Sequence, residues 1–128
     1  MSSAFWRLTV RSDFSAAHAL RHYQGKCESP HGHNFSVEAT IEGDRLTPDT
    51  ELLVDFSLIK KDLKAVLDTL DHTDLNVTPP FDTINPSSEN LSRHIFKELA
   101  PLVAPHGVRL HSVTVGERAA QSATYYEA

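Results

Sequence analysis

The chain has 128 residues, the usual size of one domain, and folding at this length buries roughly two-thirds of the surface of the unfolded chain. Its net charge of -5 argues against nucleic acid as the main partner, because contacts to phosphates need a surplus of Lys and Arg. No run approaches the roughly 20 apolar residues of a membrane span, and the N-terminus lacks the features of a signal peptide. We therefore expect a single domain over residues 1–128, located in the cytoplasm, with no nucleic-acid or membrane partner.

Two strands and a helix are predicted in the first half of the chain. Apolar and polar side chains alternate over residues 5–14, which is typical of a half-buried strand. After a polar loop over residues 21–30, the same alternation returns over residues 35–42. Asp55 is a suitable N-cap for the helical spacing of apolar side chains that follows over residues 56–70.

A second helix is predicted over residues 91–102, where apolar side chains again follow helical spacing. Pro86 fits its first turn, with Asn85 or Ser87 as the cap. Pro101 should end or kink this helix, because proline has no backbone N–H to donate.

The chain returns to the strand pattern over residues 108–117 and 122–127. The order of two strands, two helices and two strands predicts an α+β fold, a four-stranded antiparallel sheet with both helices on one face. Such a sheet has two open edges, and open edges commonly pair with other subunits. We therefore expect an oligomer.

Four of the eight histidines fall within one short stretch, namely His18, His22, His31 and His33. Residues i and i+2 of a strand point to the same face, about 7 Å apart, so His31 and His33 can converge on one ion. His18, at the end of the neighbouring strand, is the natural third ligand of a catalytic zinc site, and His22 is its rival. All four could instead make ordinary hydrogen bonds. We interpret three further histidines as structural: His94, His106 and His111.

Cys27 is the only cysteine, so an intrachain disulfide is excluded, which fits a reducing cytosol. Its thiol could be a fourth zinc ligand that closes the site, a base or nucleophile activated by the metal and Lys26, or an inert side chain. Asp71 and His72 could form a relay in which the carboxylate orients the imidazole. Adjacent residues do not easily hydrogen-bond in that way, so His72 could equally interact with the helix C-terminus.

Six stretches occur in the order and with the residue types of one enzyme family: Phe14-Ser15-Ala16-Ala17-His18, Cys27-x3-His31-Gly32-His33-Asn34, Val54-Asp55-Phe56, Leu70-Asp71-His72-x2-Leu75-Asn76, Asn85-Pro86-Ser87-Ser88-Glu89-Asn90 and Val115-Gly116-Glu117. Over essentially its whole length, the chain resembles the 6-pyruvoyltetrahydropterin synthase family. The resemblance implies a tunnelling fold (T-fold), in which a trimer closes a β-barrel and two trimers stack into a homohexamer with active sites between subunits.

Within the family, the short spacing from Cys27 to His31 is more similar to the 6-carboxytetrahydropterin synthases of queuosine and deazapurine biosynthesis. This resemblance implies a zinc-dependent lyase that converts 7,8-dihydroneopterin triphosphate to 6-carboxy-5,6,7,8-tetrahydropterin and releases acetaldehyde and triphosphate. One alternative is a 6-pyruvoyltetrahydropterin synthase, which eliminates triphosphate on a tetrahydrobiopterin-type route. Another is a zinc- or pterin-binding module without turnover, and a third is a hydrolase that uses zinc-bound water.

The resemblance also implies a set of site residues: the zinc ligands His18, His31 and His33, the catalytic residues Cys27, Asp71 and His72, and the substrate-binding Glu117. Zinc would bind the hydroxyls of the substrate side chain, and Cys27 would move a proton there as a thiolate. Asp71 and His72 would be the second proton-transfer group, reaching the site from another subunit. Glu117 would hold the guanidine-like edge of the pterin.

Two parts of the substrate site stay open at this stage. Arg118 stands where the family often has a hydroxyl residue, which leaves the pterin contacts beside Glu117 undefined. No phosphate loop marks the triphosphate site. The basic residues of the polar loop are candidates for it, with solvated loop charges as the alternative: Arg21, His22 and Lys26.

Overall fold

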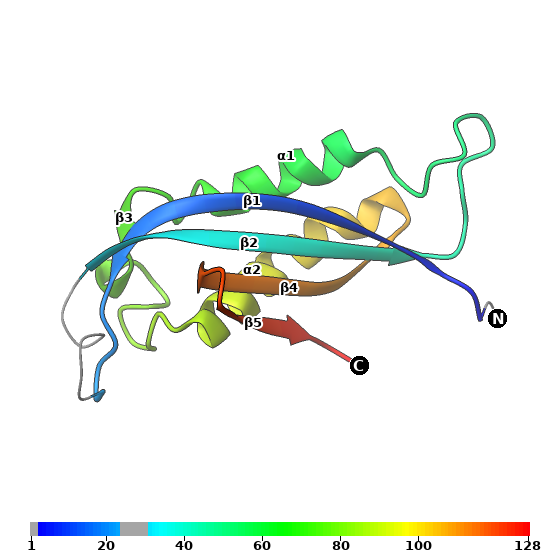
Figure 1. The fold of residues 1–128 in the computed structure, drawn as a ribbon. Helices are drawn as coiled ribbons and strands as arrows, with labels where there is room; N and C mark the ends of the chain where they lie inside the picture. Colours follow the sequence, from blue (N-terminus) through cyan, green and yellow to red (C-terminus); the bar gives the residue numbers. More distant parts are fainter. Residues whose placement is uncertain (1–2, 24–30) are drawn as a thin grey trace.

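The computed structural model describes residues 3–23 and 31–128, with the backbone alone for residue 31. Its elements are β1 (Trp6–His18), β2 (His31–Gly43), α1 (Phe56–Leu67), β3 (Thr73–Asp74), the 3-10 turn η2 (Leu75–Val77), α2 (Ser88–Val103), the 3-10 turn η3 (Ala104–His106), β4 (Arg109–Arg118) and β5 (Gln121–Tyr126). Figure 1 shows the strands as one layer with both helices behind it. The predicted α+β class and order of the main elements are confirmed.

The sheet has five strands in the order β3-β1-β2-β4-β5, rather than the predicted four. The four long strands pair antiparallel, while β3 pairs parallel with β1 at Ala16 and Ala17 and makes the sheet mixed. A strand of two residues is too short to show alternation, which is why the pattern did not predict it. In the described chain, the rest of β1 and the outer side of β5 have no further strand beside them.

The first two strands are longer than predicted, and their extra residues carry the histidines. β1 continues to His18 and β2 begins at His31, because the antiparallel ladder extends to the end of both strands. In this ladder His18 lies opposite residue 31, and Ala16 lies opposite His33. The register therefore gathers positions 18, 31 and 33 at one end of the sheet.

The helices begin at caps that can be recognised in the sequence. Asp55 caps α1 as predicted, and Ser87 caps α2, so Pro86 precedes the cap and does not occupy the first turn. Pro101 was predicted to end or kink α2 but lies inside it. Its place in the last turn limits the loss to one backbone hydrogen bond, and burial of Val103 in the core holds the final residues in helical conformation.

The core lies between the helices and one face of the sheet. Alternate residues of the long strands point into it, and Phe14 stacks on Phe35 with ring centroids 4.9 Å apart. The opposite face of the sheet is polar, with the cross-strand pair Arg11 and Glu38 at 2.8 Å. In the described part of the chain, no helical segment has both the length and the apolar character that a membrane crossing requires.

Candidate active site

The imidazoles of His18 and His33 meet at the end of β1 and β2, on the face of the sheet that packs against the helices. His18 is buried and His33 is about a quarter exposed, and their rings lie edge to face with centroids 5.5 Å apart. Nε2 of His18 lies 3.1 Å from Oε1 of Glu117, and Nε2 of His33 lies 3.4 Å from Oε2 of the same carboxylate. Three side chains from three strands thus converge on one point.

The second ring nitrogen of His18 is held by the backbone. Nδ1 lies 3.0 Å from the carbonyl oxygen of Pro86, the buried residue before the cap of α2. Because a carbonyl oxygen only accepts, Nδ1 carries the hydrogen, and the lone pair of the neutral ring is on Nε2. Metal-ligating histidines are oriented in this way. The fully buried Phe35 packs against both imidazoles, with centroids 5.0 and 6.1 Å away.

These three side chains form a possible metal-binding group. One ligand atom each of His18, His33 and Glu117 lie within 4.8 Å of one another. Two imidazole nitrogens and a carboxylate oxygen suit zinc, and the tautomer of His18 places its lone pair on the ring nitrogen that faces Glu117. The backbone of His31, the third predicted ligand, lies opposite His18 in the ladder, while its side chain lies outside the description. Cys27 also lies outside the described residues.

Glu117 also forms part of the wall of a cavity of about 350 Å³. The cavity lies between the N-terminus of α2 and the start of β5. Its other lining residues are Leu20, Ser87, Ser88, Glu89, Gln121, Ser122 and Ala123. Hydroxyl, carboxylate and amide groups in a cavity of this size suit a small polar ligand. The predicted substrate-binding residue thus lies between the histidines and a place for a ligand.

The family described as 6-pyruvoyl tetrahydropterin synthase matches residues 7–128. The chain belongs to this family. The sequence motifs predicted a lyase that acts on pterins and has a T-fold, and membership of this family supports all three features.

Individual members of the family cover nearly the whole chain. A 6-carboxy-5,6,7,8-tetrahydropterin synthase from Synechocystis is 34% identical over 94% of this chain and 93% of that protein. A human 6-pyruvoyl tetrahydrobiopterin synthase is 33% identical over 87% of this chain and 84% of that protein. The structure of a Caenorhabditis elegans 6-pyruvoyl tetrahydropterin synthase superposes with a TM-score of 0.86 at 28% identity, covering 98% of this chain and 97% of that one.

The pair predicted from the Asp71-His72 motif of this family is formed. Oδ2 of Asp71 lies 3.0 Å from Nδ1 of His72, whose side chain is 83% exposed. The other carboxylate oxygen accepts the backbone N–H of Ser15 at 2.8 Å, and this hydrogen bond is the main reason that the pKa of Asp71 is lowered. Burial opposes the shift, and the neighbouring imidazolium adds to it. The expectation that adjacent residues hardly bond in this way was wrong, and the contact occurs where His72 has a positive φ.

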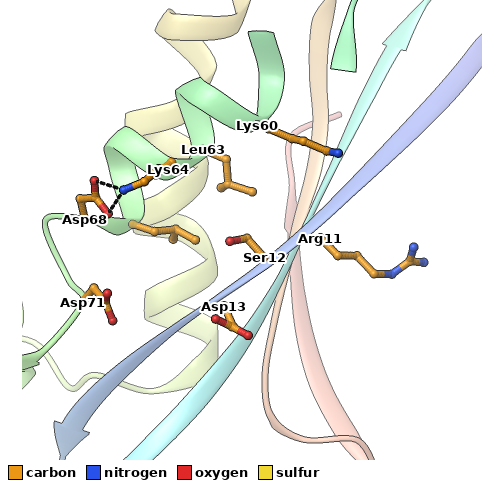
Figure 2. A pocket seen from close by; sticks show the side chains of 9 residues that line it. Arg11, Ser12, Asp13, Lys60, Leu63, Lys64, Asp68 and Asp71 are labelled. Carbon is orange, nitrogen blue, oxygen red and sulfur yellow. Dashed lines mark hydrogen bonds and ion pairs between the residues drawn. The ribbon is translucent and has the colours of Figure 1, made fainter. Parts of the chain in front are cut away.

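A cleft of about 340 Å³ between β1 and α1 has Asp71 in its wall (Figure 2). The cleft is lined by both charges: Arg11, Lys60 and Lys64, and Asp13, Asp68 and Asp71, with Ser12, Leu63 and Leu67 between them. Figure 2 shows Lys64 reaching both oxygens of Asp68, at 2.8 and 3.0 Å. None of the three residues of the metal group lines this cleft.

The structure gives Arg21, a candidate for the triphosphate site, a different role. Its guanidinium donates to three backbone carbonyls, those of Asn76 at 3.1 Å, Phe81 at 2.7 Å and Ile84 at 3.1 Å. These bonds direct three of the five N–H donors of the guanidinium to the backbone. Of the other two candidates, His22 has an exposed side chain, and Lys26 lies outside the described residues. The sequence did not predict this role because the three acceptors are backbone oxygens, which every residue has.

Among the described residues, three further histidines lie outside the metal group: His94, His106 and His111. His94 is half-buried against the ring of Phe81, and burial lowers the pKa of its imidazole. His106 bonds to the carboxylate of Asp62 at 2.8 Å, and His111 lies 3.1 Å from the hydroxyl of Ser112. His22, the rival third ligand, has an exposed side chain and also lies outside the group.

Proposed function

We propose that this chain is a zinc-dependent 6-carboxytetrahydropterin synthase of queuosine and deazapurine biosynthesis. It would convert 7,8-dihydroneopterin triphosphate to 6-carboxy-5,6,7,8-tetrahydropterin and release acetaldehyde and triphosphate. The observation that carries the proposal is the convergence of the His18 and His33 imidazoles beside the cavity that Glu117 lines. The short Cys27 to His31 spacing and the similarity to the Synechocystis enzyme support the carboxy product.

His18, His31 and His33 would hold the zinc ion. When bound, zinc supplies Lewis acidity, which favours ionisation of a substrate hydroxyl and stabilises developing negative charge on oxygen. The buried position of His18 and its bond to the Pro86 carbonyl fix one ligand before the ion binds. An oriented ligand loses little freedom on coordination, which supports tight binding.

Proton transfer would belong to two groups of this chain. His72 would hold or release a proton at its exposed ring, and Asp71 would orient that ring. The anchor of the Asp71 carboxylate on the backbone of Ser15 supports this orienting role. Cys27, as a thiolate, would move the second proton on the substrate side chain.

Glu117 would bind the pterin. Its carboxylate accepts two hydrogen bonds from the guanidine-like edge of the ring, in a charge-assisted pair. Its place in the cavity wall supports the assignment. The short distances to His18 and His33 support a rival role as a metal ligand, and the two roles make different predictions for the Gln variant.

We further propose that the enzyme is a cytoplasmic homohexamer, in which barrel-forming trimers stack in pairs. The open edges of β1 and β5 support pairing between subunits. His72 lies at the edge of β1 with its ring exposed, so a proton-transfer group is available to a neighbouring subunit. The mass of the purified protein, measured by light scattering, tests the assembly.

The decisive experiment is incubation of the zinc-loaded protein with 7,8-dihydroneopterin triphosphate, followed by identification of the pterin and the carbon fragment released. Acetaldehyde together with 6-carboxytetrahydropterin is expected. A pyruvoyl product without acetaldehyde would assign the chain to the pathway of the human relative instead. Stoichiometric binding of zinc and pterin without any product would make it a binding module.

A further inference from the structure

The residues that follow His18 are joined to a distant loop by two asparagine side chains. Asn76 accepts the N–H of Ala19 at 2.7 Å and donates to the carbonyl of the same residue at 2.9 Å. Asn85 does the same with Arg21, with both bonds at 2.9 Å. Each asparagine thus satisfies both backbone groups of one residue, and the end of β1 is fixed to the segment between α1 and α2.

The side chain of Arg21 adds a third connection to the same segment, besides the bonds of its backbone to Asn85. Nη1 donates to the carbonyl of Ile84, and Nη2 donates to the carbonyls of Asn76 and Phe81. The three acceptors are spread over nine residues of the same segment, so one planar group fixes its path. A lysine could supply a similar charge but not this fork of donors.

We propose that Arg21 is a positioning residue for the metal centre, an inference that rests on the zinc site proposed above. The segment that Arg21 holds runs directly into Pro86, and the carbonyl of Pro86 fixes the ring of His18. Arg21 and His18 lie three residues apart in the chain, and both are bound to residues 76–86. Arg21 therefore sets the distance between the imidazole and the carbonyl that orients it.

The position of this carbonyl matters because the bond from Nδ1 determines which nitrogen of His18 faces the metal. Loss of such an outer contact typically weakens metal binding by roughly 10–100-fold. Replacement of Arg21 by alanine removes three hydrogen bonds but leaves the four bonds of Asn76 and Asn85 in place. We therefore expect the variant to keep its fold, while residues 76–84 lose their connection to the Arg21 side chain and the Pro86 carbonyl is less precisely placed.

The test compares wild-type protein with Arg21→Ala, Arg21→Lys and the control Arg7→Ala. Arg7 is an exposed arginine at the start of β1, and its side chain is paired with Glu42 at 2.9 Å. The zinc dissociation constant is measured by competition with a chromophoric chelator, and the absorption spectrum of the cobalt-substituted protein reports the geometry of the ligands. Circular dichroism shows whether each variant is folded.

We expect about 10-fold weaker zinc binding for Arg21→Ala, the low end of the range for a direct outer contact because Arg21 acts through Pro86. An altered cobalt spectrum for Arg21→Ala, incomplete rescue by Arg21→Lys and wild-type values for Arg7→Ala are also expected. Wild-type zinc affinity and cobalt spectrum in Arg21→Ala, with only a lower melting temperature, would overturn the positioning role. If Arg21→Ala does not fold, the same two readouts in Arg21→Lys decide. Failure of the wild-type protein itself to bind zinc would overturn the metal site, which is a separate result.

Discussion

Asp71 and His72 are adjacent in the sequence, yet Oδ2 of the first lies 3.0 Å from Nδ1 of the second. The contact exists because His72 has a φ of 59° and its backbone N–H donates to the carbonyl of Ser15 at 2.6 Å. The N–H of Ser15 in turn donates to the other oxygen of Asp71. An anchored carboxylate therefore holds an exposed imidazole at the edge of the sheet, as a proton relay requires.

The substitution Asp71→Asn should lower kcat by roughly 10²–10⁴-fold, because an amide cannot stabilise the charged imidazolium. The amide oxygen can still accept from Ser15, so zinc affinity and fold should be unchanged. The rate of acetaldehyde formation measures the effect. Asp68→Asn is the control, since Asp68 is an exposed carboxylate whose side chain pairs with Lys64, and it should keep the wild-type rate. A wild-type rate for Asp71→Asn would exclude the relay.

The stability of the protein should depend on pH through Asp71. Its pKa is lowered in the folded protein, chiefly by the N–H of Ser15, whereas an unfolded aspartate titrates near pH 3.9. The stabilisation is therefore complete above about pH 4 and is lost as the pH falls through the lowered pKa. Denaturant unfolding of wild type and Asp71→Asn should give free energies that converge below about pH 4. A constant difference down to about pH 3 would contradict the assignment.

Removal of a zinc ligand should abolish metal binding and the stability that the metal confers. At a thousandfold excess over its dissociation constant, a ligand stabilises the folded state by about 4 kcal/mol, so zinc should raise the melting temperature of the wild type. His33→Ala should show neither binding nor the rise. His111→Ala, which changes a strand histidine outside the metal group, should show both. A normal zinc response of His33→Ala would remove His33 from the ligand set.

The substitution Glu117→Gln separates the two roles that the geometry allows. As a pterin anchor, the glutamate makes charge-assisted hydrogen bonds, and their loss should raise KM by roughly 10–100-fold with zinc affinity unchanged. Glu38→Gln, on the polar face of the sheet, is the matched control and should leave KM unchanged. Loss of zinc by Glu117→Gln would instead make this residue a metal ligand.

Ser87 should contribute to stability as the cap of α2. Its hydroxyl accepts the N–H of Asn90 at 3.1 Å, and loss of such a cap costs about 1 kcal/mol. We expect Ser87→Ala to lower the free energy of unfolding by this amount in urea titrations. Ser88→Ala, one residue further on, removes a hydroxyl that is not the cap and should have a much smaller effect. Equal effects of both changes would rule out the capping role.

Local patterns were sufficient to predict most of the fold. Alternation predicted the four long strands, and helical spacing behind Asp55 predicted α1, because burial on one side of an element imposes its period on the sequence. β3 was missed, since two residues show no period. The interior position of Pro101 was also missed, because the packing of Val103 in the core outweighs one lost hydrogen bond.

The sequence by itself determined the family, through motifs that occur in order along the chain. It also predicted that His18 and His33 lie close together, because they belong to neighbouring strands with a defined period. Only the tertiary structure brought Glu117 from a third strand to both imidazoles, and only it joined Arg21 to the carbonyls behind His18. These contacts bridge residues that are far apart in the chain. They depend on sheet register and loop path, which leave no periodic pattern in the sequence.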